Sequence, residues 1–366
     1  MGKSCIVLLS GGLDSLLAVR LMTAQGLRVV ALHSINCFHG TQTLEEKKRK
    51  LREDALRLGA SDILFPDITG DVIEVTKSPR FGYGRNLNAC IDCRQRTVAA
   101  GFKAMRETGA DFVVSGEVVG QRPMSQRRDA ITLTDKAVAS WGFAGLFLRP
   151  LSAKLLEPTI PEKEGWIDGD CLFDISGRGR ERQMTLAEKL ELGDYPSPAG
   201  GCLLTDAEFS RKLATLMLFK ENWTARDVEL LKVGRHFQIS PGTKIVASRR
   251  EEENYRLREL AEPEDRLFIN NQRPGAIVLR RGPASPETDR LAGGLAVYFS
   301  KMRDDGSAEV ESWTEQDGKT AVSLDMTDAV PPTEAKALEA TTINGNALKI
   351  MRGRIADGKK KRNAEK

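Results

Sequence analysis

The sequence predicts an α/β protein in which a doubly wound parallel sheet is followed by a smaller α+β domain and a flexible basic tail. Strand and helix signals alternate through the first third of the chain, the second half mixes helices with β-rich segments, and the end is rich in Ala, Thr, Pro, Lys and Asn. A chain of 366 residues is also longer than the chains that usually fold around a single hydrophobic core, so we expect more than one domain. We expect four parts: a first domain at 1–165, a connector at 166–215, an α+β domain at 216–326 and a tail at 327–366.

The first domain alternates short apolar segments with amphipathic ones, which is typical of repeated β-α-β units. We expect strands at Cys5–Leu9, Val29–Leu32, Ile63–Phe65 and Phe112–Ser115. We expect helices at Leu13–Leu21, Leu44–Leu58 and Arg94–Glu107, ending at Gly26, Gly59 and Gly109. Strands separated by helices in this way indicate a parallel sheet with helices on both faces.

The remaining chain is less regular. Gly, Pro and Arg accumulate over Leu151–Pro198, so we expect a connector with one helix near Met184–Leu192 that closes over a site. The second domain is expected to hold helices at Phe209–Phe219, Ala225–Val233 and Glu287–Phe299, and strands at Lys244–Ala247, Leu267–Asn270, Ile277–Leu279 and Ala308–Trp313. From Thr327 the composition predicts a disordered tail that ends in the basic run Gly358–Arg362.

Composition limits the functional classes. The chain is 40% hydrophobic and 29% charged, and no run approaches the roughly 20 apolar residues of a membrane span. It starts without the apolar core of a secretory signal, and its six cysteines are too dispersed for a disulfide scaffold. We therefore expect a cytoplasmic protein with no membrane partner. The net charge of +4 permits a nucleic-acid partner but does not require one.

A glycine-rich loop lies between the first predicted strand and helix. Its residues are Ser10, Gly11, Gly12, Leu13, Asp14 and Ser15. Backbone N–H groups at a helix N-terminus bind phosphate, glycines let the chain approach it, and Asp14 is a candidate magnesium ligand. Neither the G-x-x-x-x-G-K-S/T loop nor the G-x-G-x-x-G fingerprint is present. The alternative is a tight turn with a purely structural role.

Two further segments are candidate nucleotide contacts because they follow predicted strands of the same sheet. His33 and Ser34 come directly after the second strand, and Ser115 and Gly116 lie at the end of the fourth. The polar segment that continues from Gly116 contributes two more candidates, Gln121 and Arg122. An ordinary surface loop has the same composition and is the alternative for this segment.

The loop sequence SGGLDS resembles the PP-loop of ATP pyrophosphatases, the adenine nucleotide alpha hydrolase (HUP-type) family that includes tRNA thiolases. The segment Ser115–Gln126 is similar to the corresponding segment of ThiI-like and MnmA-like thiolation proteins. The resemblance implies a Rossmann-like domain that binds ATP with Mg²⁺, forms an adenylate and releases pyrophosphate.

Three cysteines are candidates for sulfur chemistry. Cys90 and Cys93 form a C-x-x-C pair before a predicted helix, a position that lowers a thiol pKa, and Cys202 ends the glycine-bearing segment Ser197–Cys202. In the tRNA thiolases that this chain resembles, such a pair and one later cysteine form the sulfur site. A persulfide and a 4Fe–4S cluster on these three thiolates both remain open. A zinc site completed by a histidine, or unrelated buried thiols, would also produce this pattern.

Two features suggest RNA binding. Arg178, Arg180 and Arg182 alternate with other residues and are candidate phosphate contacts together with the basic tail, although a solvated charged surface fits them too. The segment Asp289–Arg303 resembles the helix and turn of an NFACT-type RNA-binding domain.

Together these features predict an ATP-dependent tRNA sulfurtransferase that adenylylates a uridine carbonyl and then replaces its oxygen with sulfur. The expected partners are tRNA and a sulfur donor, which is a cysteine desulfurase, a carrier or sulfide. A second hypothesis is a small-molecule synthetase that adenylylates a carboxylate or carbonyl without RNA. A third is a non-catalytic RNA-binding factor that keeps the nucleotide fold as a scaffold.

Overall fold

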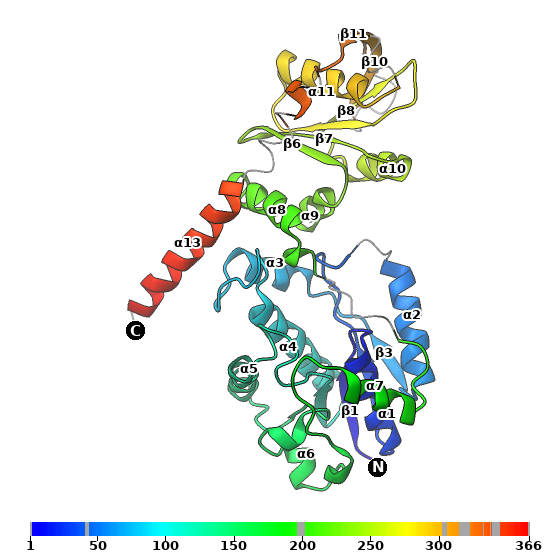
Figure 1. Cartoon of the computed structure of the whole chain (residues 1–366), viewed down its shortest axis with the longest axis vertical. Helices are drawn as coiled ribbons and strands as arrows, with labels where there is room; N and C mark the ends of the chain where they lie inside the picture. Colours follow the sequence, from blue (N-terminus) through cyan, green and yellow to red (C-terminus); the bar gives the residue numbers. More distant parts are fainter. Residues whose placement is uncertain are drawn as a thin grey trace. The chain divides into compact units, whose positions relative to one another are not determined.

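The computed structural model describes residues 2–40, 44–195, 202–301, 306–314, 323–331, 333–336, 338 and 345–364. The chain divides into two compact units, Met1–Cys202 and Leu203–Lys366. The division falls inside the segment expected to be a connector. Figure 1 shows the helices and strands of both units.

The first unit contains a five-stranded parallel sheet in the order β3-β2-β1-β4-β5. Its strands are β1 (Ser4–Leu8), β2 (Arg28–Leu32), β3 (Asp62–Leu64), β4 (Phe112–Ser115) and β5 (Phe147–Leu148). The four strands predicted from the sequence are confirmed, and the two-residue β5 was not predicted. Strand β1 pairs with β2 on one side and with β4 on the other. Successive strands are therefore added to one edge of the sheet up to β3 and to the opposite edge from β4 onward. Ligands of such sheets bind at the carboxyl ends of the strands at this point.

Helices cover both faces of this sheet. They are α1 (Leu13–Ala24), α2 (Leu44–Arg57), α3 (Thr69–Lys77), α4 (Cys90–Thr108), α5 (Arg128–Ser140), α6 (Ile160–Lys163) and α7 (Glu181–Lys189). Side chains of β1 alternate between two cores: Cys5 and Val7 pack with α1, and Ile6 and Leu8 pack with α4. Helices α1, α2 and α4 were predicted, but α4 begins at Cys90, four residues earlier than expected. Helices α3 and α5 were not predicted.

The segment after β5 is irregular as expected, but it packs as part of the first unit. Leu172 and Ile175, and then Leu186 and Ala187 of α7, are buried in the same core as α1. Beyond α7, the Arg20 side chain donates a hydrogen bond to a backbone carbonyl in the turn that follows. Helix α7 is therefore fixed against α1, the helix that the glycine loop begins.

The second unit is built on a six-stranded antiparallel sheet in the order β11-β10-β8-β9-β7-β6. Its strands are β6 (Arg235–Ser240), β7 (Thr243–Ala247), β8 (Arg266–Asn270), β9 (Val278–Arg281), β10 (Ser307–Thr314) and β11 (Ser323–Asp328). Its helices are α8 (Ala207–Phe219), α9 (Ala225–Leu231), α10 (Glu251–Leu260), α11 (Pro286–Tyr298) and α13 (Gly345–Ala364). One face of the sheet packs on α11, and the other packs on α9 and α10. Strands β6 and β11 and helix α10 were not predicted.

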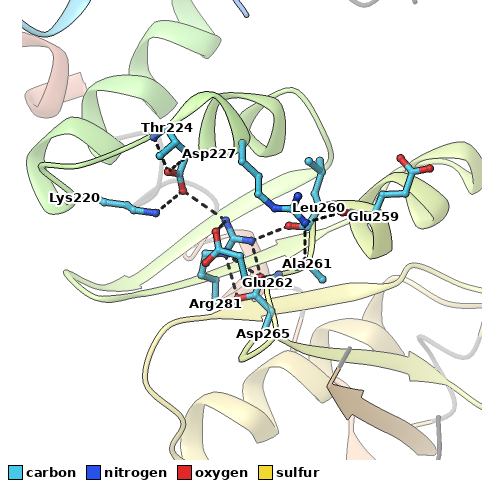
Figure 2. Close-up of polar contacts among 10 residues, drawn as sticks. Lys220, Thr224, Asp227, Glu259, Leu260, Ala261, Glu262, Asp265 and Arg281 are labelled. Carbon is cyan, nitrogen blue, oxygen red and sulfur yellow. Dashed lines mark hydrogen bonds and ion pairs between the residues drawn. The ribbon is translucent and has the colours of Figure 1, made fainter. Parts of the chain in front are cut away.

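An ion-pair network joins α9 to the sheet of the second unit. Figure 2 shows the Arg281 guanidinium between Asp227 on one side and Asp265 and Glu262 on the other. The Arg281–Asp265 contact is 2.6 Å, and Lys220 contacts Asp227 at 2.8 Å. Both aspartates are almost fully buried, so each depends on these cations for compensation.

The prediction of a disordered tail at 327–366 is wrong for part of this segment. Strand β11 extends to Asp328, Val330 and Ala335 lie in the core with α11, and α13 begins at Gly345. Ala347 and Met351 of α13 are buried, and α13 packs on α8. The composition of this segment indicated disorder because its few apolar residues are outnumbered by polar ones. Those few residues are the ones that pack on the rest of the second unit. Met302 and Arg303 of the predicted helix and turn lie outside the described residues. Within the described residues, no helix has both the length and the apolar character needed to cross a membrane.

Candidate functional site

The glycine loop is held in shape by its own hydroxyl groups. Ser10 Oγ and Ser15 Oγ lie 3.1 Å apart, and Ser15 Oγ donates a hydrogen bond of 2.8 Å to the Gly12 carbonyl. Gly11 has a φ of 86°, a left-handed conformation that favours glycine. The Leu13 side chain is fully buried in the core, so this residue contributes only its backbone to the surface of the loop. The loop therefore presents backbone N–H groups at the start of α1, the arrangement that binds phosphate.

Gly116 brings the end of β4 into contact with the start of α1. A Cβ atom at this position would lie 2.2 Å from the Asp14 carbonyl oxygen and 2.6 Å from the Ser15 backbone nitrogen. These are backbone atoms of a helix, which cannot turn aside as a side chain does. Only glycine allows the two candidate segments to meet.

Asp14 is the charged centre of the loop. Its Oδ2 accepts a hydrogen bond of 2.9 Å from Gln121 Nε2, whereas its Oδ1 is buried and has no hydrogen-bond partner among the described residues. Burial raises the pKa of the Asp14 carboxyl, although Gln121 and the charges of Arg180 and Arg122 act in the opposite direction. An unpaired carboxylate oxygen beside a phosphate-binding loop fits the predicted role as a magnesium ligand.

His33 and Ser34 lie in the same region, after the carboxyl end of β2. His33 Nδ1 is 2.8 Å from the Leu9 carbonyl oxygen and must donate to it, because a carbonyl only accepts. Burial, followed by the charge of Lys47, lowers the pKa of His33 to about 4, so the ring is neutral at physiological pH and Nε2 is an acceptor. Within the described part of the chain, neither His33 Nε2 nor Ser34 Oγ has a hydrogen-bond partner.

Sequence reasoning missed a buried ion-pair cluster directly behind Gly116. The Glu117 carboxylate contacts Arg94 Nε at 2.7 Å and Arg149 Nε at 2.9 Å, and accepts a hydrogen bond from Ser115. Burial alone would raise the pKa of Glu117, but the two guanidinium groups outweigh it and lower the pKa. Arg149 also contacts Asp135 on α5 at 2.8 Å. The cluster fixes the Ser115–Gly116 turn to α4 and α5.

The three candidate cysteines lie close together. Cys90 and Cys93 occupy the first turn of α4, and Cys202 forms an isolated antiparallel bridge with His39. Cys93 interacts electrostatically with both Cys202 and Cys90. Residues 197–201, which lead to Cys202 and include its predicted glycines, lie outside the described residues.

The expected lowering of the cysteine pKa values is wrong. Burial raises the pKa of Cys93 to about 12, and it also raises the pKa of Cys90 despite a hydrogen bond from Asn88 and the charge of Arg122. The pair begins the helix rather than preceding it, and loss of solvation outweighs the favourable position. Of the remaining cysteines, Cys5 and Cys37 are buried, whereas Cys171 is exposed and donates a hydrogen bond to Asp168.

No group of three or more His, Cys, Asp or Glu side chains in the described residues is arranged to hold a metal ion. The three thiols lie near one another, but they do not form such a group. A cluster on Cys90, Cys93 and Cys202 therefore does not fit this arrangement of the thiols.

The alternating arginines have different surroundings. Arg180 acts electrostatically on Asp14 at the glycine loop, whereas Arg182 forms an exposed ion pair with Asp174. Arg178 is exposed. The sequence pattern suggested one set of RNA contacts, but the start of α7 at Glu181 directs these side chains differently.

A parallel sheet whose first strand leads through a glycine loop into a helix is the arrangement of the PP-loop fold class. Comparison with protein families agrees: residues 2–153 match the family described as thiamine biosynthesis protein (ThiI), and residues 234–335 match the NFACT protein RNA binding domain. The resemblance predicted from the sequence is confirmed over these two ranges. No curated protein matches the chain.

Several solved structures are similar to this chain at low identity. The C-terminal part of the fibronectin/fibrinogen-binding protein from Streptococcus suis is 15% identical, with 43% of this chain and 73% of that chain covered and a TM-score of 0.26. A 4-thiouridine synthetase in complex with RNA and bound ATP is 18% identical, with a TM-score of 0.32, and the match spans 52% of each chain. NMN synthetase from Francisella tularensis is 13% identical, with 54% and 89% covered and a TM-score of 0.24. At these values the three structures do not define the substrate of this chain.

Proposed function

We propose that this chain is an ATP-dependent tRNA sulfurtransferase. A uridine carbonyl oxygen attacks the α-phosphate of ATP bound at Ser10–Ser15, a new P–O bond forms, and pyrophosphate leaves. Sulfur from the site of Cys90, Cys93 and Cys202 then attacks the activated carbon, and AMP leaves with the original oxygen. The product is a thiouridine.

The nearness of the thiols to the glycine loop carries this proposal. The charge of Arg122 acts on both Asp14 and Cys90, so the loop and the cysteine pair flank one region. A synthetase that only adenylylates its substrate needs the loop but has no use for three adjoining thiols. Sulfur transfer to the adenylate uses both.

The chain's own residues supply the steps around ATP. Backbone N–H groups of the loop bind the phosphates, and Asp14 Oδ1 would hold Mg²⁺, which neutralises charge on the leaving pyrophosphate. The neutral His33 ring offers Nε2 as an acceptor for the amino group of adenine. The NFACT-like range 234–335 of the second unit is the proposed tRNA-binding part.

In this proposal sulfur is transferred through a cysteine persulfide. The persulfide of a cysteine desulfurase or of a carrier passes its outer sulfur to one cysteine of the site, which becomes a persulfide while the donor thiol leaves; free sulfide would serve only together with a two-electron oxidant. The terminal sulfur of the site's persulfide bonds to the activated carbon as AMP leaves, and a second thiol then attacks the inner sulfur. The S–S bond to the substrate breaks, the thiocarbonyl is released and a protein disulfide forms, which an external thiol must reduce. Because burial raises the pKa of Cys90 and Cys93, the attacking thiol must give up a proton in this step.

The Cys202→Ala variant separates adenylylation from sulfur transfer. It is expected to release pyrophosphate from ATP in the presence of tRNA as the wild type does, while thiouridine formation falls by at least roughly 100-fold because a reacting group is lost. Cys171→Ala, which removes an exposed thiol, is the matched control and should keep both reactions. Full thiouridine formation by Cys202→Ala would remove Cys202 from the reaction. ATP cleavage by the wild type that needs no tRNA would favour a small-molecule synthetase, and a wild type that never cleaves ATP with tRNA would favour an RNA-binding factor.

Iron and labile-sulfide analysis of protein purified without oxygen tests the sulfur route. The persulfide route predicts iron-free protein that gains the mass of one sulfur atom after treatment with the donor and loses it with dithiothreitol. Bound iron and sulfide that disappear in Cys90→Ala, Cys93→Ala and Cys202→Ala alike would overturn this route in favour of a three-thiolate cluster.

A further inference from the structure

Unpaired polar atoms from three distant segments gather around Asp14. They are Asp14 Oδ1, Gln121 Oε1, Arg180 Nε, and both amide atoms of Gln183, each buried and without a hydrogen-bond partner among the described residues. An unsatisfied buried polar atom costs roughly 1–3 kcal/mol, so proteins rarely accumulate them without reason. Such a concentration beside a phosphate-binding loop is the lining expected of a site for a polar ligand.

Gln183 is the most unusual of these side chains. It lies on α7 with none of its surface exposed, and it approaches Asp14 closely enough to lower the pKa of that carboxyl. Within the described structure, however, neither amide atom completes a hydrogen bond of normal geometry. A structural glutamine buried for packing alone would satisfy its amide with the backbone around it.

The position of Arg180 is fixed from both sides. Just before it, the Gly177 N–H donates a hydrogen bond of 2.8 Å to the carbonyl of Val119, in the loop after β4. Just after it, α7 packs on α1 through Leu186 and Ala187. The side chain is therefore held beside the loop by backbone and core contacts, and no ion pair with Asp14 is needed to keep it there.

The charges of the site favour an anion. Arg180 and Arg122 both act on the single carboxylate of Asp14, and the N-terminus of α1 adds a partial positive charge. Two guanidinium groups match the oxygens of a polyphosphate, which accept several hydrogen bonds at once. Helix α7 lies beyond residue 153, outside the range that matches the ThiI family.

We propose that Arg180 and Gln183 of α7 complete the ATP site: Arg180 binds the β- and γ-phosphates that leave as pyrophosphate, and Gln183 positions Asp14 for Mg²⁺. This inference rests on the proposed function because it assumes ATP as the ligand of the glycine loop. It assigns to α7 a binding role that residues 2–153 do not contain. Arg180 is then an ATP contact and not an RNA contact.

Calorimetric titration with ATP, pyrophosphate and AMP tests the role of Arg180. Arg180→Ala is expected to weaken binding of ATP and pyrophosphate by roughly 10- to 100-fold, the loss that one hydrogen bond to a charged group accounts for, and to leave AMP binding unchanged. Arg182→Ala is the matched control, two residues along the chain and paired with Asp174, and should bind all three ligands as the wild type does. A thermal unfolding curve checks that each variant is folded.

Unchanged ATP affinity in Arg180→Ala would overturn the role of Arg180. If the same variant also binds tRNA more weakly and with less dependence on salt, Arg180 is a phosphate contact of the RNA instead. A wild type that binds no ATP would overturn the proposed function as well, so the two failures are distinguishable.

A second variant tests the positioning role of Gln183. Gln183→Leu keeps the side-chain volume in the core, so the protein is expected to fold, but the amide that orients Asp14 is gone. The Mg²⁺ concentration for half-maximal ATP binding should rise by roughly 10-fold, a loss typical of a residue that orients a metal ligand, while ATP binding without Mg²⁺ stays the same. An unchanged Mg²⁺ dependence would show that Gln183 does not act through Asp14.

Discussion

A Gly116→Ala variant is expected to lose ATP binding by roughly 100-fold or more, because a small displacement of a binding loop has effects of this size. The new Cβ atom would lie 2.2 Å from the carbonyl oxygen of Asp14, a distance that no relaxation of a side chain can relieve. The start of α1 must move away from β4, and the N–H groups of the glycine loop move with it. Overpacking of this kind also destabilises the fold by about 1–3 kcal/mol. Equilibrium ATP binding and urea unfolding measure the two effects.

Gly70→Ala provides the matched control in the same unit. Gly70 lies in the first turn of α3, it is exposed, and no described atom is within 4 Å of the position of its added Cβ. Alanine is the better helix former by about 1 kcal/mol, so this variant should be slightly more stable and should bind ATP normally. Equal ATP binding by the two variants would contradict the role given to the contact between Gly116 and α1.

A Glu117→Gln variant is expected to lower the free energy of unfolding by about 3–5 kcal/mol, the usual result of removing one partner from a buried ion pair. The carboxylate is almost fully buried and compensates Arg94 and Arg149, the second of which is also buried. Glutamine has the same shape, so the loss reports charge rather than volume. Glu74→Gln, in an exposed pair with Lys77, is the control and should change stability by less than about 0.5 kcal/mol.

The effect of Glu117 should depend on pH in a defined direction. The folded-state pKa lies below the unfolded value of about 4.3, so the carboxylate contributes fully above that pH and loses its contribution as the pH falls through the folded-state pKa. The stability difference between wild type and Glu117→Gln is expected to be constant between about pH 8 and pH 5 and to shrink at lower pH. A difference that grows on acidification would contradict the assignment.

Much of the first unit follows from its sequence because local signals and the fold agree there. The leucines from Leu13 to Leu21 mark α1, and the glycine loop before them marks a phosphate site. Helix α5 gave a weak signal since the residues it buries include Ala130 and Thr134, which are small or polar. Strand β5 has only two residues, too few for any alternation to be visible.

The site itself could be predicted only in part. Sequence neighbours such as Ser10 and Ser15 were found, whereas the pairing of Glu117 with Arg149 joins residues 32 positions apart through tertiary structure. The pKa of Cys93 was misjudged because its position at a helix start is visible in the sequence and its burial is not. For the same reason the sequence did not indicate that packing of α7 brings Arg180 close to Asp14.

Nucleoside analysis of tRNA by mass spectrometry tests the central claim most directly, after incubation of the protein with tRNA, ATP, Mg²⁺ and a sulfur donor. The account predicts a thiouridine that depends on ATP, is absent from the reaction of Cys202→Ala and is formed normally by Cys171→Ala. ATP cleaved to AMP and pyrophosphate with no sulfur in the tRNA, in wild type and Cys202→Ala alike, would contradict it.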